Sequence, residues 1–124
     1  IAFSKVDRGS SDSANYGTVA VNNYLWRASL ETVGFLPLGQ VDPFGGVILT
    51  EWGSINNNEK ERYKINVFIF GSVLRADAVR VKVFKQISTG GIWKDDIINP
   101  DMSNKLELTI LERARAIKIA ETNR

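Results

Sequence analysis

Cysteine and histidine are both absent from the 124 residues of this chain. Zinc sites of the usual kind need Cys or His ligands, and cysteine proteases and Ser-His-Asp triads need a thiolate or an imidazole. A metal ion would have to bind through carboxylates and carbonyls, and no acidic loop has the spacing of a calcium or magnesium site. A disulfide framework is excluded as well. We therefore expect no catalytic residue, no cofactor, no metal site and no enzymatic activity.

Long hydrophobic runs and a strong net charge are also missing. No stretch of about 18 apolar residues occurs, which is the length that a transmembrane helix requires. The 16 basic and 14 acidic residues leave a net charge of +2, which is too small to indicate nucleic acid by itself. With 44% hydrophobic residues, the chain fits one globular domain with a sizeable core. It begins at Ile1 without an initiator methionine, so we expect that an upstream segment was removed.

The first part of the chain divides into a polar segment and a helical one. Residues 1–17 are rich in Ser, Asp, Asn and Gly, which predicts a flexible leader ahead of a single domain over residues 18–124. The helical pattern starts at Thr18, a residue type that caps helices, and stops at Gly34. The apolar face of this expected helix carries Val19, Trp26, Leu30 and Val33.

The stretch VDPFGGVILTEW, residues 41–52, predicts the first strand of an antiparallel sheet. Asp42 and Pro43 form a rigid entrance, because proline fixes its own φ and keeps the preceding residue extended. We interpret Asp42 as an Asx-type turn in preference to a partner for an arginine. Gly45 and Gly46 allow backbones to approach closely, but they lack the other residues of a nucleotide-binding motif. The preceding segment, FLPLGQ, is expected to be a connector.

Residues 62–70 and 78–87 alternate apolar and polar residues with the period of two that is typical of half-buried strands. A short edge strand at Ile92–Trp93 is compatible with the glycine turn before it. Between the two long strands, Arg75 and Asp77 lie in the motif LRADA. We favour a structural Arg–Asp clasp that fixes this loop, with an anion-binding arginine as the alternative.

A second helix is expected to start at Asn99 and Pro100, because asparagine caps a helix and proline suits its first position. Most of its apolar residues fall on one stripe, but Leu108 and Ile119 fall on the opposite side, where a monomer rarely exposes them. The order helix, strands, helix predicts an α+β fold in two layers. We expect an antiparallel sheet of three to four strands with both helices packed on one face.

The two alternating strands would place a basic patch on the face away from the helices, formed by Arg62, Lys64, Arg80 and Lys82. Such a face is often simply solvated, but it can also contact lipid headgroups, nucleic acid or an acidic partner. Aromatic residues for stacking on bases are limited there to Phe68, Phe70 and Phe84. A further alternative is a small-ligand pocket between helices and sheet, gated by Trp26, Trp52 and Trp93.

Five segments together resemble an alphaproteobacterial family of unknown function: NNYLWRASL, VDPFGGVILTEW, RYKINVFI, LRADAVRVKVF and LELTILERARAIKIA. The likeness covers about Thr18 to Thr122, and LWRASL, DPFGG and LRADA are its most specific motifs. Members of this family resemble secreted lipoproteins, which implies a periplasmic or outer-membrane-anchored protein with a lipidated cysteine upstream of Ile1. The element order is also similar to the helix-grip domains of a lipoprotein in the outer-membrane barrel assembly machine, a likeness of fold alone.

From the residues and this resemblance we expect a non-enzymatic domain of the cell envelope that acts through protein–protein contacts or self-assembly. The expected contact sites are Leu108 and Ile119 on the last helix, or the uncovered face of the sheet. A domain that binds a lipid or another small ligand is the alternative, and nucleic-acid binding through the basic face is a less favoured one. Membrane association is expected only through the upstream lipid anchor.

Overall fold

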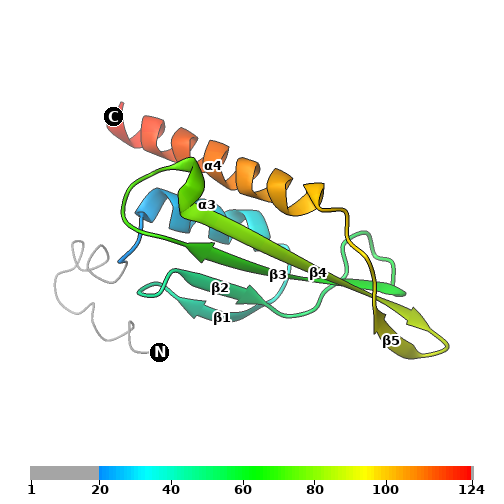
Figure 1. Ribbon diagram of the computed structural model, residues 1–124. Helices are drawn as coiled ribbons and strands as arrows, with labels where there is room; N and C mark the ends of the chain where they lie inside the picture. The colour runs from blue at the N-terminus through cyan, green and yellow to red at the C-terminus, as the bar shows by residue number, and fades with distance from the viewer. Residues whose placement is uncertain (1–19, 124) are drawn as a thin grey trace.

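The computed structural model of the chain describes residues 20–123, so the expected leader and the expected cap at Thr18 lie outside the described part. One antiparallel sheet with the strand order β1-β2-β3-β4-β5 is combined with two helices (Figure 1). The elements are α3 (Asn23–Val33), β1 (Leu38–Asp42), β2 (Val47–Thr50), β3 (Glu61–Ile69), the short 3-10 helix η1 (Ala76–Ala78), β4 (Val79–Thr89), β5 (Ile92–Asp95) and α4 (Asp101–Thr122). The α+β class is confirmed, but the sheet has five strands and not the expected three to four.

The additional strand is β1, whose residues the sequence predicts to be a connector and a strand entrance. Strand β1 pairs with β2, and residues 43–46 form the turn of this hairpin. The stretch 41–52 is therefore not one strand, and its DPFGG motif reverses the chain. The physical reason lies in two residues of the motif: Pro43 has no N–H for a sheet ladder, and Gly46 has a φ of 71°, a left-handed conformation typical of turns.

Helix α3 starts at Asn23 because Asn22 caps it. The Asn22 Oδ1 atom accepts a hydrogen bond from the backbone N–H of Leu25 at 2.9 Å. The Asn22 Nδ2 atom donates a hydrogen bond to the carbonyl oxygen of Ser72 at 3.1 Å. The backbone N–H of Asn22 donates to the carbonyl oxygen of Gly71 at 2.9 Å. One buried side chain thus begins the helix and attaches it to the loop after β3.

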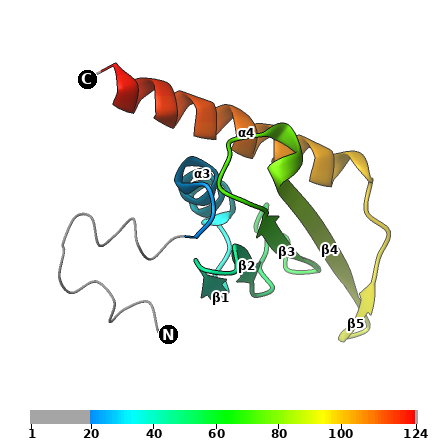
Figure 2. The same cartoon turned by 60° about the vertical axis from the view of Figure 1, so that its left-hand side comes forward.

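The core lies between the helices and one face of the sheet, and Figure 2 shows both helices on the same side of the strands. The sheet contributes Ile48, Ile65, Val67, Ile69, Val79 and Val81 to this buried cluster. The helices contribute Leu25, Trp26, Val33, Ile110, Leu111, Ala114 and Ile117. Burial of one such large apolar side chain contributes about 1.5–3 kcal/mol, so this cluster is the main source of stability.

Polar contacts fix the two helices relative to each other and to the sheet. Arg113 of α4 binds Glu31 of α3 with an Nε–Oε1 distance of 2.7 Å, and Arg27 binds Glu121 in a second interhelical ion pair. The hydrogen bond from Arg113 lowers the pKa of Glu31 below its usual value. Both pairs are exposed, so they orient the helices more than they stabilise them.

Helix α4 also protects an edge of the sheet. Strand β4 pairs with β5 only through its last residues, from Gln86 to Thr89, so its first part is an edge strand. The Glu107 Oε2 atom accepts a hydrogen bond at 2.8 Å from the backbone N–H of Val81 in this part. A charged group on an edge strand blocks pairing with another chain.

The β1–β2 turn is held by its own side chain and by β3. The Asp42 Oδ1 atom accepts hydrogen bonds from the backbone N–H groups of Phe44 and Gly45 at 3.1 and 3.0 Å, which is an Asx-type turn. The carbonyl oxygen of Gly46 accepts a hydrogen bond from the N–H of Ile69 at 2.8 Å. A Cβ atom on residue 46 would clash with the carbonyl oxygen of Ile69 and lie 2.9 Å from Val21 Cγ1.

Replacement of Gly46 by alanine tests this packing. We expect Gly46→Ala to lower the free energy of unfolding by about 2–4 kcal/mol, because strain at a left-handed residue is added to a steric clash. The matched control is Gly71→Ala, which also has a positive φ but would place its Cβ in open space, and it should cost about 1 kcal/mol. Urea unfolding measures both values. Equal losses for the two variants would contradict the close packing of the turn on β3.

Candidate functional site

One face of the sheet, the open face, is covered by neither helix of the described part (Figure 2). Side chains on a strand alternate between faces, so the residues between the buried positions of β3 and β4 lie here. The register places them in four opposed pairs: Arg62 with Gln86, Lys64 with Phe84, Asn66 with Lys82, and Phe68 with Arg80. The four basic residues named from the sequence therefore share one face.

Arg62 differs from the other three basic residues because it is held by its neighbours. Its guanidinium carbon lies 4.8 Å from the ring centre of Trp52 and 4.2 Å from that of Trp93. The Nε and Nη2 atoms donate to Gln86 Oε1 at 2.8 and 2.5 Å, and Gln86 Nε2 donates to Asp95 Oδ1 at 2.9 Å. Arg62 thus joins β3 to the segment after β2 and to β5. We assign it a structural role and not a binding role.

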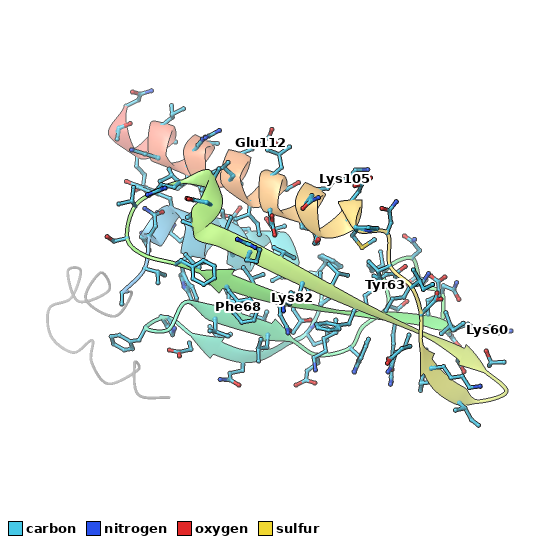
Figure 3. All side chains as sticks on the ribbon, viewed as in Figure 1. Lys60, Tyr63, Phe68, Lys82, Lys105 and Glu112 are labelled. Carbon is cyan, nitrogen blue, oxygen red and sulfur yellow. The ribbon has the colours of Figure 1, made fainter. Side chains whose placement is uncertain are left out.

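The other basic residues of the open face lie beside apolar side chains, with Lys64 opposite Phe84 and Arg80 opposite Phe68. Phe84 is 42% exposed, and Phe68, Val47 and Leu49 are partly buried on the same face. The pair of Asn66 and Lys82 separates Phe84 from Phe68. No acidic side chain among residues 20–123 forms an ion pair with the three cations. We call this surface the basic patch, defined by Val47, Leu49, Lys64, Phe68, Arg80, Lys82 and Phe84; Phe68 and Lys82 are labelled in Figure 3.

The outer face of α4 carries the two apolar residues named from the sequence, and both are exposed: Leu108 by 53% and Ile119 by 59%. Their separation of 11 residues is three helical turns, about 16 Å. Glu112 and Arg115 lie between them on the same side of the helix, and Glu112 is turned away from the sheet (Figure 3). Neither helix of the described part is long and apolar enough to cross a membrane.

The LRADA motif forms the loop that leads into β4. The Arg75 Nη2 and Asp77 Oδ2 atoms lie 2.9 Å apart, and the two side chains are 62% and 66% exposed. The backbone N–H of Ala78 donates to the carbonyl oxygen of Arg75 at 3.1 Å and closes the short helix η1. The Arg–Asp pair predicted from the sequence is formed, and it is exposed rather than buried, so it contributes little to stability.

An apolar cavity of about 290 Å³ opens on the helix side of the sheet, under the first turns of α4. Its walls are Phe35, Ile55, Tyr63, Ile65, Val83, Met102 and Leu106, with Asn99, Asp101 and Lys105 at the rim. The predicted gate of three tryptophans is wrong. Trp26 is buried in the core, and Trp52 and Trp93 hold Arg62 on the opposite face.

The sequence suggested a pocket between helices and sheet as an alternative, but it did not identify the residues of this cavity, because its walls come from separate segments. Phe35 follows α3, Ile55 follows β2, and the other apolar walls lie on β3, β4 and α4. In the sequence each of these residues has the pattern of an ordinary core position. Only the position of the helix ends over the sheet brings them around one space.

Two comparisons with known proteins match most of the chain. The family model DUF3576, described as a domain of unknown function, matches residues 19–119. An uncharacterized protein of Rickettsia prowazekii (strain Madrid E) is 43% identical over 115 residues, which is 90% of this chain and 67% of that protein. The family match includes α3, all strands of the sheet and most of α4.

Replacement of Arg62 by methionine tests its structural role. We expect Arg62→Met to lower the free energy of unfolding by about 1–3 kcal/mol, since two cation–π contacts and the hydrogen bonds to Gln86 are lost. The emission of Trp52 and Trp93 should shift in the folded variant. The control, Lys64→Met, removes a cation on the same strand that lies 5.8 Å from the ring centre of Trp52, and it should cost less than about 0.5 kcal/mol. Equal costs in chemical denaturation would contradict the assignment.

Proposed function

This chain belongs to the DUF3576 family, as its motifs predicted, and from that premise we propose that it is a non-enzymatic interaction domain of the cell envelope. The observation that carries the proposal is the basic patch, where apolar side chains and three cations share a face of the sheet that no described helix covers. The motif resemblance to secreted lipoproteins supports a periplasmic or outer-membrane-anchored location. The arrangement of both helices on one side of the sheet supports a two-layer, helix-grip-like sandwich as the scaffold.

The chemistry of the basic patch favours an acidic protein segment as its partner. Protein interfaces combine apolar with polar contacts, and here Phe84 and Phe68 provide apolar surface while Lys64, Arg80 and Lys82 alternate with them on the same face. Cations on such a surface accelerate and orient the approach of an acidic partner. A second copy is a poor partner for this face, because a two-fold contact would bring like charges together.

Nucleic acid is less well suited to the same face. Recognition of single strands uses aromatic rings on which bases stack. The two largest rings of this face, Trp52 and Trp93, hold the guanidinium of Arg62 between them. Only the phenylalanines of the patch remain for stacking, so we place the acidic protein segment first.

Charge reversal in the basic patch tests this proposal. A set of short peptides in which Asp and Glu flank Leu or Phe serves as probe, and binding is followed by amide chemical shifts in NMR spectra. We expect shifts centred on Phe84 and Lys82 that weaken with salt, and at least a tenfold loss of affinity in Lys82→Glu and in Phe84→Ser. Lys118→Glu on the exposed surface of α4 is the charge-matched control and should bind as the wild type does.

Other anionic surfaces are the competing outcomes of that experiment. Vesicles with an anionic lipid and a single-stranded oligonucleotide are titrated in parallel at the same ionic strength. Binding to either of them without binding to the acidic peptides would overturn the choice of a protein partner. Shifts that map outside the basic patch would overturn the assignment of the surface.

A second candidate function, self-association, is favoured by a different observation on α4. If two copies of α4 pack antiparallel about a two-fold axis between Glu112 and Arg115, each Leu108 meets Ile119 of the other copy. The same axis places each Glu112 opposite the other copy's Arg115. The outer face of the helix is therefore complementary to itself in both apolar contacts and charge. The contact is small, so we expect a weak dimer.

Reversal and restoration of charge test the α4 dimer. Glu112→Arg should abolish dimers, because two arginines would then meet two arginines, and the double variant Glu112→Arg/Arg115→Glu should restore them. Sedimentation velocity over a wide range of concentrations measures the dimer fraction. Leu108→Asp should leave only monomer, and Lys118→Glu is the control that keeps the wild-type fraction. A wild type that stays monomeric throughout, or a double variant that is not restored, would rule out this contact.

A further inference from the structure

The apolar cavity under α4 points to a second site, and we propose that it binds the hydrocarbon chain of a single-chain amphiphile with an uncharged polar end. The cavity is distinct from the basic patch, because Ile65 and Val83 line it on the helix side of the sheet. Its apolar walls surround a volume of about 290 Å³. Figure 3 labels Tyr63 and Lys105 at this end of the molecule.

The cavity exists because the two helices cover the sheet unequally. Helix α3 ends at Val33, while β3 and β4 continue beyond it, and the first turns of α4 lie over the part that α3 leaves uncovered. Ile65 is buried, whereas Tyr63, Val83 and Leu106 are only partly buried. Water in such a space finds few hydrogen-bond partners, and its replacement by hydrocarbon removes apolar surface from water.

The size of the cavity limits the ligand. A volume of about 290 Å³ is at the lower end of the range of about 300–1,000 Å³ for ligand sites. One water molecule occupies about 30 Å³ in the liquid, so the cavity holds on the order of ten non-hydrogen atoms. A single alkyl or acyl chain of about eight to ten carbons fits this space. The space is too small to enclose a sterol or both chains of a phospholipid.

The rim indicates the nature of the polar end. Asp101 and Lys105 are four residues apart on α4, so they lie on neighbouring turns at the mouth. An anionic head group of the ligand would be attracted by Lys105 and repelled by Asp101. A cationic head group would be attracted by Asp101 and repelled by Lys105. The third rim residue, Asn99, already uses its Oδ1 atom to accept the N–H of Asp101 at 2.9 Å. The rim therefore favours a polar end without net charge, which can donate to Asp101 and accept from Lys105.

Met102 provides a direct measurement, because it is the only methionine of the sequence and it lines the cavity. The chain carrying a carbon-13 label in its methionine methyl groups is titrated with octyl glucoside below its micelle concentration. We expect a saturable shift of the Met102 methyl signal and contacts in NMR spectra between the octyl chain and the ring of Tyr63. Glucose, which lacks the chain, should cause no shift, and octanoate and octylammonium should bind at least fivefold more weakly.

A cavity-filling variant and a matched control complete the test. Ile55→Trp should weaken octyl glucoside binding at least tenfold, because the indole occupies the cavity. Ile92→Trp adds the same indole at a position that is 61% exposed and away from the cavity, and it should bind as the wild type does. No saturable shift, an equal response to glucose, or unchanged binding in a folded Ile55→Trp would overturn the site. Tighter binding of octanoate would overturn the uncharged end. Lys82→Glu should keep full binding, so this result is independent of the basic patch.

Discussion

Burial of one face of β3 beneath two helices is the constraint on which the rest of this molecule depends. Ile65, Val67 and Ile69 alternate along the strand, and each is buried in the core. Because a strand turns successive side chains to opposite faces, the residues between them must point away from the helices. The same strand therefore provides the hydrophobic driving force and presents Lys64 and Phe68 on the open face. A shift of the register by one residue would exchange these roles and place a lysine in the core.

Burial on the helix side also decides how the cations of the open face are used. Arg62 lies near the start of β3, where Trp52 and Trp93 from two other segments reach the same face and enclose it. Arg80 and Lys82 lie farther along, opposite residues of β3 whose neighbours on β2 are Val47 and Leu49. The four positions look equivalent in the alternating pattern. Their surroundings make one of them part of the scaffold and leave the others available to a partner.

Helix α4 links the separate features of the fold. Its inner face fills the core, Glu107 binds the edge of β4, and Arg113 connects it to α3. Because it is twice as long as α3, with 22 residues against 11, its first turns extend over a part of the sheet that α3 does not reach. The cavity follows from this difference in length.

Local chemistry made the secondary structure readable from the sequence. The period of two in residues 62–70 and 78–87 and the Asn-Pro start of the last helix predicted β3, β4 and α4 nearly at their observed bounds, and the motifs predicted the family. The hairpin at DPFGG and the cap at Asn22 were missed. The first needs a pairing partner to distinguish a strand entrance from a turn, and the second depends on the loop around Gly71 and Ser72.

By itself, then, the sequence determined the α+β class, the inward and outward sides of the strands and the exposed positions of α4, since each depends on residues that are neighbours in the chain. Only the tertiary structure decided that Arg62 is enclosed by two indoles, that Trp26 is a core residue, and that an apolar cavity lies under α4. These features join segments far apart in the chain, and their geometry is set by helix length and strand register. A local sequence pattern carries no information about which distant segments come into contact.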